Sequence, residues 1–312
     1  MKKLLLILLC LPMIGFGQFT MIPDANFEQK LINLGYDNGA INGSVYTAMI
    51  NTITSLDVEY SNISDLTGIE DFTALTYLNC NSNQLTSLDV SQNTALTYLY
   101  CYSNQLTSLD VSQNTALIDL NCHINQITSL DVSANTALIN LYCLLNQLTS
   151  LDVSGATALT TLWCWDNQLT SLDVSQNTAL YRLNCNSNQL TSLDVSQNTA
   201  LTYLYCNSNQ LTSLDVRNGN NTNMVYFDSE SNPSLSCINV DDFQYSLFNW
   251  TYIDTQHYFS NNCSPSAIEE NSTNKELLKV TDLLGRETKG TKNEVLFYIY
   301  DDGTVEKRIV IE

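Results

Sequence analysis

The sequence predicts a mainly β solenoid, which is a rod built from stacked coils, and three observations support this fold class. A unit of 21 residues, first present as "LTYLNCNSNQLTSLDVSQNTA" at residues 75–95, starts again with leucine at positions 96, 117, 138, 159, 180 and 201. Within each unit, apolar and polar residues alternate over short stretches, as in a strand with one buried face. A single coil cannot enclose its few apolar side chains, so neighbouring coils are expected to stack around a shared core.

Fixed positions within the unit identify the type of repeat. Counted from the leading leucine, positions 1, 4 and 14 are Leu in all seven copies, position 6 is Cys, position 9 is Asn and position 16 is Val. This pattern matches the leucine-rich consensus LxxLxLxxNxL, with Cys in the third apolar slot. The frame LxxLx(C/V)xxN recurs ten residues later in each copy, which predicts a strand on each of two sides of the coil.

These repeats resemble the 21-residue leucine-rich repeats called IRREKO, whose second half reads LxxLDL, over residues 75–216. The segment at residues 53–75 is similar to an internalin-type repeat and is expected to form an irregular first coil. The resemblance therefore implies a leucine-rich repeat solenoid of about seven to eight coils over residues 53–216.

One cysteine per copy forms a column at position 6. These residues follow a buried Leu by two positions, so they are predicted to point inward, where a thiol fills a narrow layer of the core. Disulfide bonds along the column are the alternative, but parallel Cβ vectors about 5 Å apart do not suit a bridge. Catalysis or metal binding is disfavoured because buried thiols stay protonated. The column comprises Cys80, Cys101, Cys122, Cys143, Cys164, Cys185 and Cys206.

Two polar columns accompany the cysteines. The asparagines at position 9 are expected to satisfy backbone groups where the chain turns inward after the strand. The aspartates at position 15, between Leu and Val, are expected to face solvent on the second side. Their mutual repulsion would be relieved either by a bound cation or by hydrogen bonds from serine together with screening by water and salt. The two columns are Asn83, Asn104, Asn125, Asn146, Asn167, Asn188 and Asn209, and Asp89, Asp110, Asp131, Asp152, Asp173, Asp194 and Asp215.

The N-terminal region is predicted to contain an export signal and a cap. Two lysines precede the apolar run "LLLILLCLPMIGF", which predicts a signal peptide at residues 1–17 with cleavage near Gly17; a lipoprotein signal through Cys10 is the alternative. Residues 18–52 are expected to cap the first coil. Their segment "IPDANFEQKLINLG" has apolar residues at helical spacing, Asp24 at its start and Gly35 at its end.

The C-terminal cap is expected at residues 217–263, where the repeat pattern has ended. This segment holds Cys237 and Cys263, which enclose a loop of about 25 residues. Exported chains retain disulfide bonds, so these two cysteines are predicted to be bridged. A polar linker is expected at residues 264–274.

Residues 275–312 differ in composition and are predicted to form three short strands, with "DDG" as a hairpin turn. The segments "VTDLLGRE" and "LFYIYDDGTVEKRIVI" resemble the C-terminal sorting domain of Bacteroidetes type IX secretion substrates, although the upstream "YPNP" segment is lacking. The resemblance implies passage through the periplasm, engagement of the type IX secretion machinery, and a final location outside the cell or on its outer surface.

Composition and motifs exclude several classes of function. The net charge is -20 with only 12 Lys and Arg, whereas nucleic-acid binding needs clustered cations. Beyond the N-terminus, no apolar run approaches the ~20 residues of a transmembrane segment. Enzyme signatures such as GxSxG, HExxH and a glycine-rich phosphate loop are missing, so no catalytic residue, metal or cofactor is expected.

The candidate ligand-binding surface lies at the outward positions 3, 5, 7 and 8, which vary while positions 9–16 barely change. Aromatic and apolar residues gather there in the middle copies, and such exposed patches mark contact surfaces. A protein-binding or adhesion module is the favoured function, a glycan binder is the alternative, and a general preference of Tyr and Trp for strand surfaces is the simplest explanation. The candidate residues are Tyr98, Tyr100, Tyr102, His123, Tyr142, Leu144, Trp163 and Trp165.

Overall fold

The computed structural model describes residues 18–263, 277–281, 286–288, 295–300 and 305–309, which belong to two compact units divided after Asn262. The predicted signal peptide at residues 1–17 and the predicted linker at residues 264–274 lie outside the described residues. In the part of the chain that is described, no helix has the length and apolar character needed to cross a membrane.

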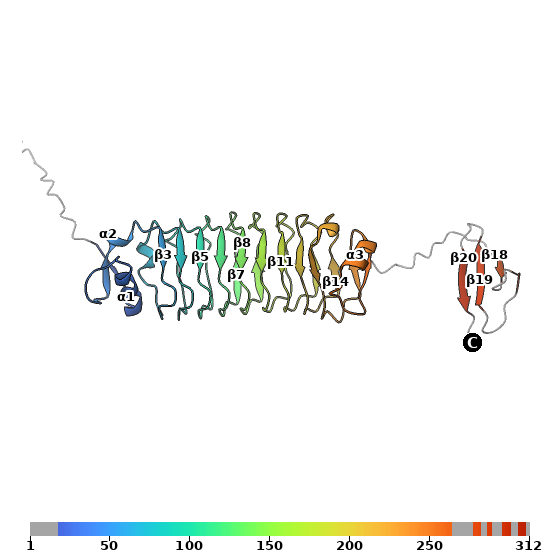
Figure 1. Ribbon diagram of the computed structural model, residues 1–312, viewed down its shortest axis with the longest axis horizontal. Coiled ribbons are helices and arrows are strands. Elements are labelled where there is room, and N and C mark those ends of the chain that lie inside the picture. Colours follow the sequence, from blue (N-terminus) through green and yellow to red (C-terminus); the bar gives the residue numbers. More distant parts are fainter. Residues whose placement is uncertain (1–17, 264–276, 282–285, 289–294, 301–304, 310–312) are drawn as a thin grey trace, which may run out of the picture. The chain divides into compact units, whose positions relative to one another are not determined.

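A parallel sheet of nine three-residue strands forms the first side of the solenoid (Figure 1). We call it the long sheet. Its strands are hydrogen-bonded in chain order, and their central residues are aligned, so that Leu78 pairs with Leu99 and Leu99 with Leu120. The strands are β3 (Ser55–Asp57), β4 (Tyr77–Asn79), β5 (Tyr98–Tyr100), β6 (Asp119–Asn121), β8 (Asn140–Tyr142), β10 (Thr161–Trp163), β11 (Arg182–Asn184), β13 (Tyr203–Tyr205) and β15 (Tyr226–Asp228).

The second side of the solenoid has shorter ladders. In copies 3 and 4, β7 (Ser129–Asp131) pairs with β9 (Ser150–Asp152). Further along lie β12 (Ser192–Asp194), β14 (Ser213–Asp215), β16 (Cys237–Asn239) and β17 (Tyr258–Ser260) as one parallel sheet. Copies 1, 2 and 5 keep the buried Leu and Val of this segment but form no strand there. The two-sided solenoid is therefore confirmed, with a less regular second side.

The core between the two sides is built from the invariant apolar positions. The Leu at positions 1 and 4 and the Val at position 16 are buried in every copy, as are all seven column cysteines. The cysteines are free thiols, which confirms that the column is unbridged. Burial raises the pKa of the Cys80 thiol to about 12, so the column acts as a row of small apolar groups.

A left-handed turn follows each long-sheet strand at position 8, where φ is 52° to 55° in the seven copies. The position-9 asparagines are buried beside this turn, and their amides bond to backbone groups as predicted. The aspartates at position 15 are exposed or half-exposed, also as predicted.

The N-terminal cap contains α1 (Ala25–Asn33), α2 (Thr47–Ile50) and a hairpin-like pair, β1 (Phe19–Met21) with β2 (Ser44–Tyr46). The Asp24 carboxylate caps α1 by accepting from the backbone N–H of Phe27 at 3.0 Å, and it also accepts from Ser64 N–H at 2.8 Å. The same side chain thus starts the helix and ties it to the irregular first coil, which contains the short 3-10 helix η1 (Ile69–Asp71).

The C-terminal cap continues the stacking beyond Val216, because β15 pairs with β13 and β16 pairs with β14. A second 3-10 helix, η2 (Asn221–Asn223), and α3 (Phe243–Asn249) lie in this region. Aromatic residues fill its core: the rings of Phe227 and Trp250 are stacked with centroids 4.2 Å apart. The predicted disulfide bond between Cys237 and Cys263 is present.

The second unit is a small antiparallel sheet. Its strands β18 (Leu277–Thr281), β19 (Val295–Tyr300) and β20 (Val305–Ile309) pair in that order, which confirms the three predicted strands. The proposed "DDG" turn at residues 301–303 lies outside the described residues.

Candidate functional site

The outer face of the long sheet is formed by alternate residues of its strands. In β5, Leu99 points inward and is fully buried, whereas Tyr98 is 38% exposed and Tyr100 is half-buried. The same alternation in each copy presents positions 3 and 5 to solvent, and positions 7 and 8 follow at the end of the strand. Because neighbouring strands lie about 4.8 Å apart, large side chains on this face contact those of the next coil.

Aromatic rings form a cluster over the first copies. Tyr77 makes an edge-to-face contact with Tyr100, with centroids 5.6 Å apart, and lies 6.4 Å from Tyr98. Tyr102 is stacked on the imidazole of His123, with centroids 4.5 Å apart and planes 9° apart. Three of the predicted tyrosines and the predicted histidine therefore lie side by side on this face. Tyr77 also belongs to the cluster. Comparison of the copies does not indicate it, because copy 1 otherwise matches the consensus.

Burial controls ionisation in this cluster. Partial burial lowers the pKa of His123, so its ring is held neutral as it stacks on Tyr102. Burial, followed by the negative charge of Asp119, raises the pKa of Tyr100 to about 12. The Asp119 carboxylate is itself half-buried, which raises its pKa, and it accepts a hydrogen bond from Asn140 Nδ2 at 2.9 Å. The Tyr100 hydroxyl therefore remains a neutral hydrogen-bonding group.

The middle copies carry the two predicted tryptophans. Trp163 is 36% exposed and makes an edge-to-face contact with Tyr142, with ring centroids 5.3 Å apart, while Trp165 is half-buried. These residues bring broad apolar surface to the outer face, which is typical of protein and sugar contacts.

The predicted exposure of Leu144 is wrong, since this side chain is only 7% exposed. At position 7 the adjoining coils place His123 and Trp165, whose larger rings flank the shorter leucine across the close spacing of the strands. The structure therefore removes Leu144 from the set of exposed candidates.

The outer face continues further than the sequence predicted. Over copies 6 and 7, the Arg182 guanidinium lies over the rings of Tyr203 and Tyr181, 4.7 Å and 5.5 Å from their centroids. Beyond the last copy, the rings of Tyr205 and Tyr226 are stacked. The sequence contains a signal for the tyrosines of copy 7, because this copy has Tyr at positions 3 and 5, as copy 2 does. Tyr226 lies outside the repeat and has no counterpart to compare.

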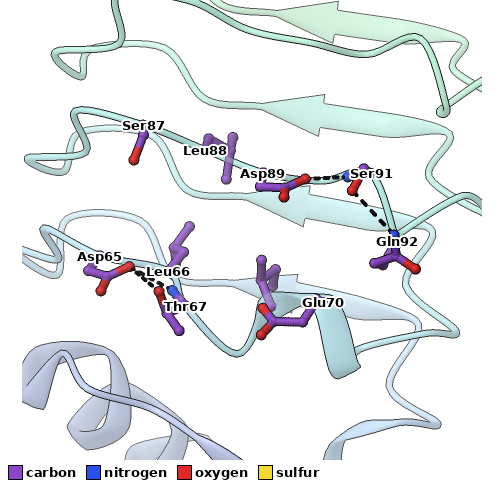
Figure 2. A pocket seen from close by; sticks show the side chains of 10 residues that line it. Asp65, Leu66, Thr67, Glu70, Ser87, Leu88, Asp89, Ser91 and Gln92 are labelled. Atoms are coloured by element: carbon purple, nitrogen blue, oxygen red, sulfur yellow. Dashed lines mark hydrogen bonds between the residues drawn. The ribbon is translucent and has the colours of Figure 1, made fainter.

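The second side offers a different surface, rich in Ser and Asp. A shallow hollow of about 370 Å³ lies between the irregular first coil and copy 1, and Figure 2 shows the side chains that line it. Its carboxylates already have partners: Asp65 accepts from Thr67 N–H at 2.8 Å, and Asp89 from Ser91 N–H at 2.9 Å. That backbone hydrogen bond, with a further one from the Ser91 side chain, lowers the pKa of Asp89.

The same Asp-to-Ser contact recurs along the aspartate column, for example between Asp152 and Ser154 N–H at 2.9 Å. Among the described residues, no group of three or more His, Cys, Asp or Glu side chains is arranged to hold a metal ion. The column thus shapes the turn after each segment of the second side.

Comparison with known proteins identifies similar repeats in internalins. No family model matches the chain. Internalin J of Listeria monocytogenes serotype 4b (strain F2365) is 41% identical over 71 residues, which are 23% of this chain and 8% of internalin J. The functional domain of InlJ from Listeria monocytogenes, a structure described as including a cysteine ladder, is 38% identical with a TM-score of 0.55. That match covers 78% of this chain and 61% of the InlJ domain.

A further solved structure, internalin C2 of Listeria monocytogenes strain 4b F2365, is 23% identical with a TM-score of 0.56, over 66% of this chain and 94% of internalin C2. This second likeness concerns the fold alone. The chain spans less than two thirds of the InlJ domain and a small part of whole internalin J. The similarity to the InlJ domain therefore supports an internalin-like leucine-rich repeat fold.

Proposed function

We propose that this internalin-like leucine-rich repeat protein is a non-enzymatic binding or adhesion module that holds a protein partner on the outer face of the long sheet. The observation that carries the proposal is the row of half-exposed aromatic rings along this face, from Tyr77 in β4 to Tyr226 in β15. The opposite side repeats the same Ser and Asp residues in each copy. Aromatic side chains supply much of the binding energy at protein interfaces.

Backbone strain in the middle copies supports the proposal. Position 8 has left-handed backbone in every copy, and Ser occupies it in copies 1, 2, 6 and 7. In copy 3 the residue is Ile124, with φ of 52°, although a β-branched side chain in this region costs roughly 1 kcal/mol or more. Its side chain is 45% exposed, so burial does not offset that cost. The exposed apolar side chain of Ile124 adds to the proposed contact surface.

The two tryptophans provide the sharpest test. A partner is first identified by cross-linking to the full chain in its natural surroundings, and its affinity is then measured by calorimetry. Replacing Trp163 and Trp165 with Ala is expected to weaken binding by at least ~2 kcal/mol, or about 30-fold. Both side chains lie on the outer face, so the circular dichroism spectrum should be unchanged.

The matched control is the pair Asp152→Asn and Asp173→Asn on the second side, which should leave the affinity intact. Equal affinity of the wild type and the double Trp variant would show that the partner binds elsewhere. If the captured ligand is an oligosaccharide, the same surface serves as a glycan-binding site, because exposed Trp163 and Tyr98 rings can also stack on sugar faces.

We also propose that residues 275–312 are a sorting unit for type IX secretion, which would place the protein outside the cell or on its outer surface after passage through the periplasm. The small antiparallel sheet and the sequence resemblance support this proposal. Deleting residues 275–312 should leave the protein in the periplasm, as detected by immunoblotting of cell fractions. Unchanged appearance in the medium or on the surface would contradict it.

A further inference from the structure

Three tyrosines at the C-terminal end of the long sheet form a continuous stack. The ring centroids of Tyr205 and Tyr226 are 4.5 Å apart with planes inclined by 24°, and those of Tyr226 and Tyr252 are 5.3 Å apart with planes inclined by 26°. Tyr252 is 49% exposed, and the other two rings are half-buried. We call Tyr205, Tyr226 and Tyr252 the tyrosine stack. The stack joins the rings of three adjacent coils, with Tyr252 the most exposed of the three.

Carboxylates lie beside this stack. Burial, followed by the negative charge of Asp228, raises the pKa of the Tyr226 hydroxyl, and Glu230 adds to the effect. Asp228 is only 9% exposed and accepts a hydrogen bond from Glu230 N–H at 3.1 Å. Neither Asp228 nor Glu230 forms an ion pair with a Lys, Arg or His among the described residues. Burial also raises the pKa of the Asp228 carboxyl, which has no cation beside it from the described part of the chain.

The neighbouring coils show how the same face holds a cation. The Arg182 guanidinium lies over Tyr203 and Tyr181, 4.7 Å and 5.5 Å from the ring centroids. Tyr203 and Tyr226 are aligned partners in adjacent strands, so the tyrosine stack continues the same row of rings. In the coils around Arg182, the protein supplies both the aromatic rings and the guanidinium that lies over them. Around Tyr226 it supplies rings and carboxylates but no guanidinium.

The outer face as a whole is also negatively charged. Its outward positions carry one arginine, Arg182, and a histidine whose pKa is lowered by burial. Against these stand six acidic residues: Asp57, Glu59, Asp119, Asp166, Asp228 and Glu230. A partner with clustered positive charge is therefore electrostatically complementary to this face.

We infer that the tyrosine stack, with Asp228 and Glu230, receives an arginine side chain from a basic segment of the protein partner. A planar guanidinium stacks on aromatic rings and bonds to carboxylates at the same time, whereas a lysine ammonium does so less well. The inference rests on the proposed function and adds to it the chemistry of the partner and a second contact region, beyond the tryptophans.

The test uses fluorescein-labelled hexa-arginine and hexa-lysine peptides with the full chain at low salt, measured by fluorescence anisotropy. We expect hexa-arginine to bind more tightly than hexa-lysine. Tyr226→Ala and Glu230→Gln should each weaken hexa-arginine binding at least threefold. Glu230 is exposed, so its variant is expected to fold even if the tyrosine variant does not.

Asp173→Asn removes one charge from the second side and is the charge-matched control. An equal loss of affinity in Asp173→Asn and Glu230→Gln would show that the peptide is attracted nonspecifically to an acidic protein, and would overturn the inference. The inference would also be overturned if the wild type did not bind hexa-arginine. A natural partner that is lost from the Trp163 and Trp165 variant but retained by Glu230→Gln and Tyr226→Ala would overturn this inference alone and leave the proposed function standing.

Discussion

The side-chain amide of Asn104 joins two coils through Cys80: its Nδ2 donates to the Cys80 carbonyl at 3.0 Å and to the Cys101 carbonyl at 3.0 Å. Its Oδ1 accepts from Leu85 N–H at 3.0 Å. The two carbonyls each accept from a second asparagine of the column as well, Asn83 for Cys80 and Asn125 for Cys101, whereas the Leu85 N–H depends on Asn104. The contact repeats along the column, so the asparagines continue the hydrogen-bond ladder around the corner of the solenoid.

Removing one of these amides from the middle of the column should be strongly destabilising. In Asn146→Ala, the Ile127 N–H loses its acceptor at 3.0 Å. The Cys122 and Cys143 carbonyls each lose one of two amide donors and keep the other, from Asn125 and Asn167. We expect the free energy of unfolding to fall by about 2–4 kcal/mol, because one unsatisfied buried N–H costs ~1–3 kcal/mol and the lost carbonyl hydrogen bonds add to that cost. Urea denaturation measures this change. The adjacent exposed variant Gln147→Ala should cost less than ~0.5 kcal/mol, and a similar cost for both would contradict the role of the column.

The sequence predicted this column because the position is invariant and follows a strand, but it did not predict a second one. Asn114, at position 19, is fully buried, and its Nδ2 donates to the carbonyls of Val90 and Asn93 in the preceding coil at 2.9 Å and 3.0 Å. Its surroundings, "SQNTA", are typical of an exposed turn. Burial there depends on how closely the coils stack, which a single coil's sequence does not reveal.

The proposed binding surface was predictable only where copies could be compared. Variation among the repeats pointed to Trp163 and Trp165, and the structure places both on the outer face. The same comparison gave no information on Tyr226, which lies beyond the repeats. The comparison of copies was also wrong about the exposure of Leu144. The exposure of a position-7 side chain depends on the size of its neighbours in the adjoining coils.

The disulfide bond should matter more than the free thiols. Reducing the bond between Cys237 and Cys263 is expected to lower the free energy of unfolding by about 2–5 kcal/mol, through the larger entropy of the unfolded chain. A column substitution such as Cys143→Ala should cost only about 1 kcal/mol. Urea denaturation with and without reductant measures the first change.

Thiol counting checks the cysteine assignment independently. Without reductant, unfolded protein that starts at residue 18 should show seven reactive thiols, and the native protein should react slowly because the thiols are buried with raised pKa. One thiol or none after unfolding would mean that the column is bridged.

Acid should destabilise the solenoid through the aspartate column. Hydrogen bonds from the following Ser lower the pKa of Asp89, Asp110, Asp152 and Asp173. A lowered pKa stabilises the fold above the unfolded value of about 3.9, and this contribution is lost as the pH falls through the folded value. Changing all four to Asn keeps the acceptor without titration, so Tm should fall less between pH 5 and pH 3 than in the wild type. Identical Tm losses in thermal melts would refute this account.

Copy 4 contains a position where restoring the repeat consensus should be harmful. Most copies have Gln at position 18, whereas copy 4 has Gly155, and a Cβ atom there would lie 1.7 Å from the carbonyl oxygen of Ser133 in the preceding coil. The obstacle is backbone, so a whole coil must shift to relieve it. We expect Gly155→Gln to lower the free energy of unfolding by about 1–3 kcal/mol, the usual cost of overpacking, as measured by urea denaturation.

The control is Ala134→Gln in copy 3, where a Cβ is already present and the change should be nearly neutral. Stabilisation by Gly155→Gln would show that copy 4 can adopt the spacing of its neighbours and that its glycine reflects no structural constraint.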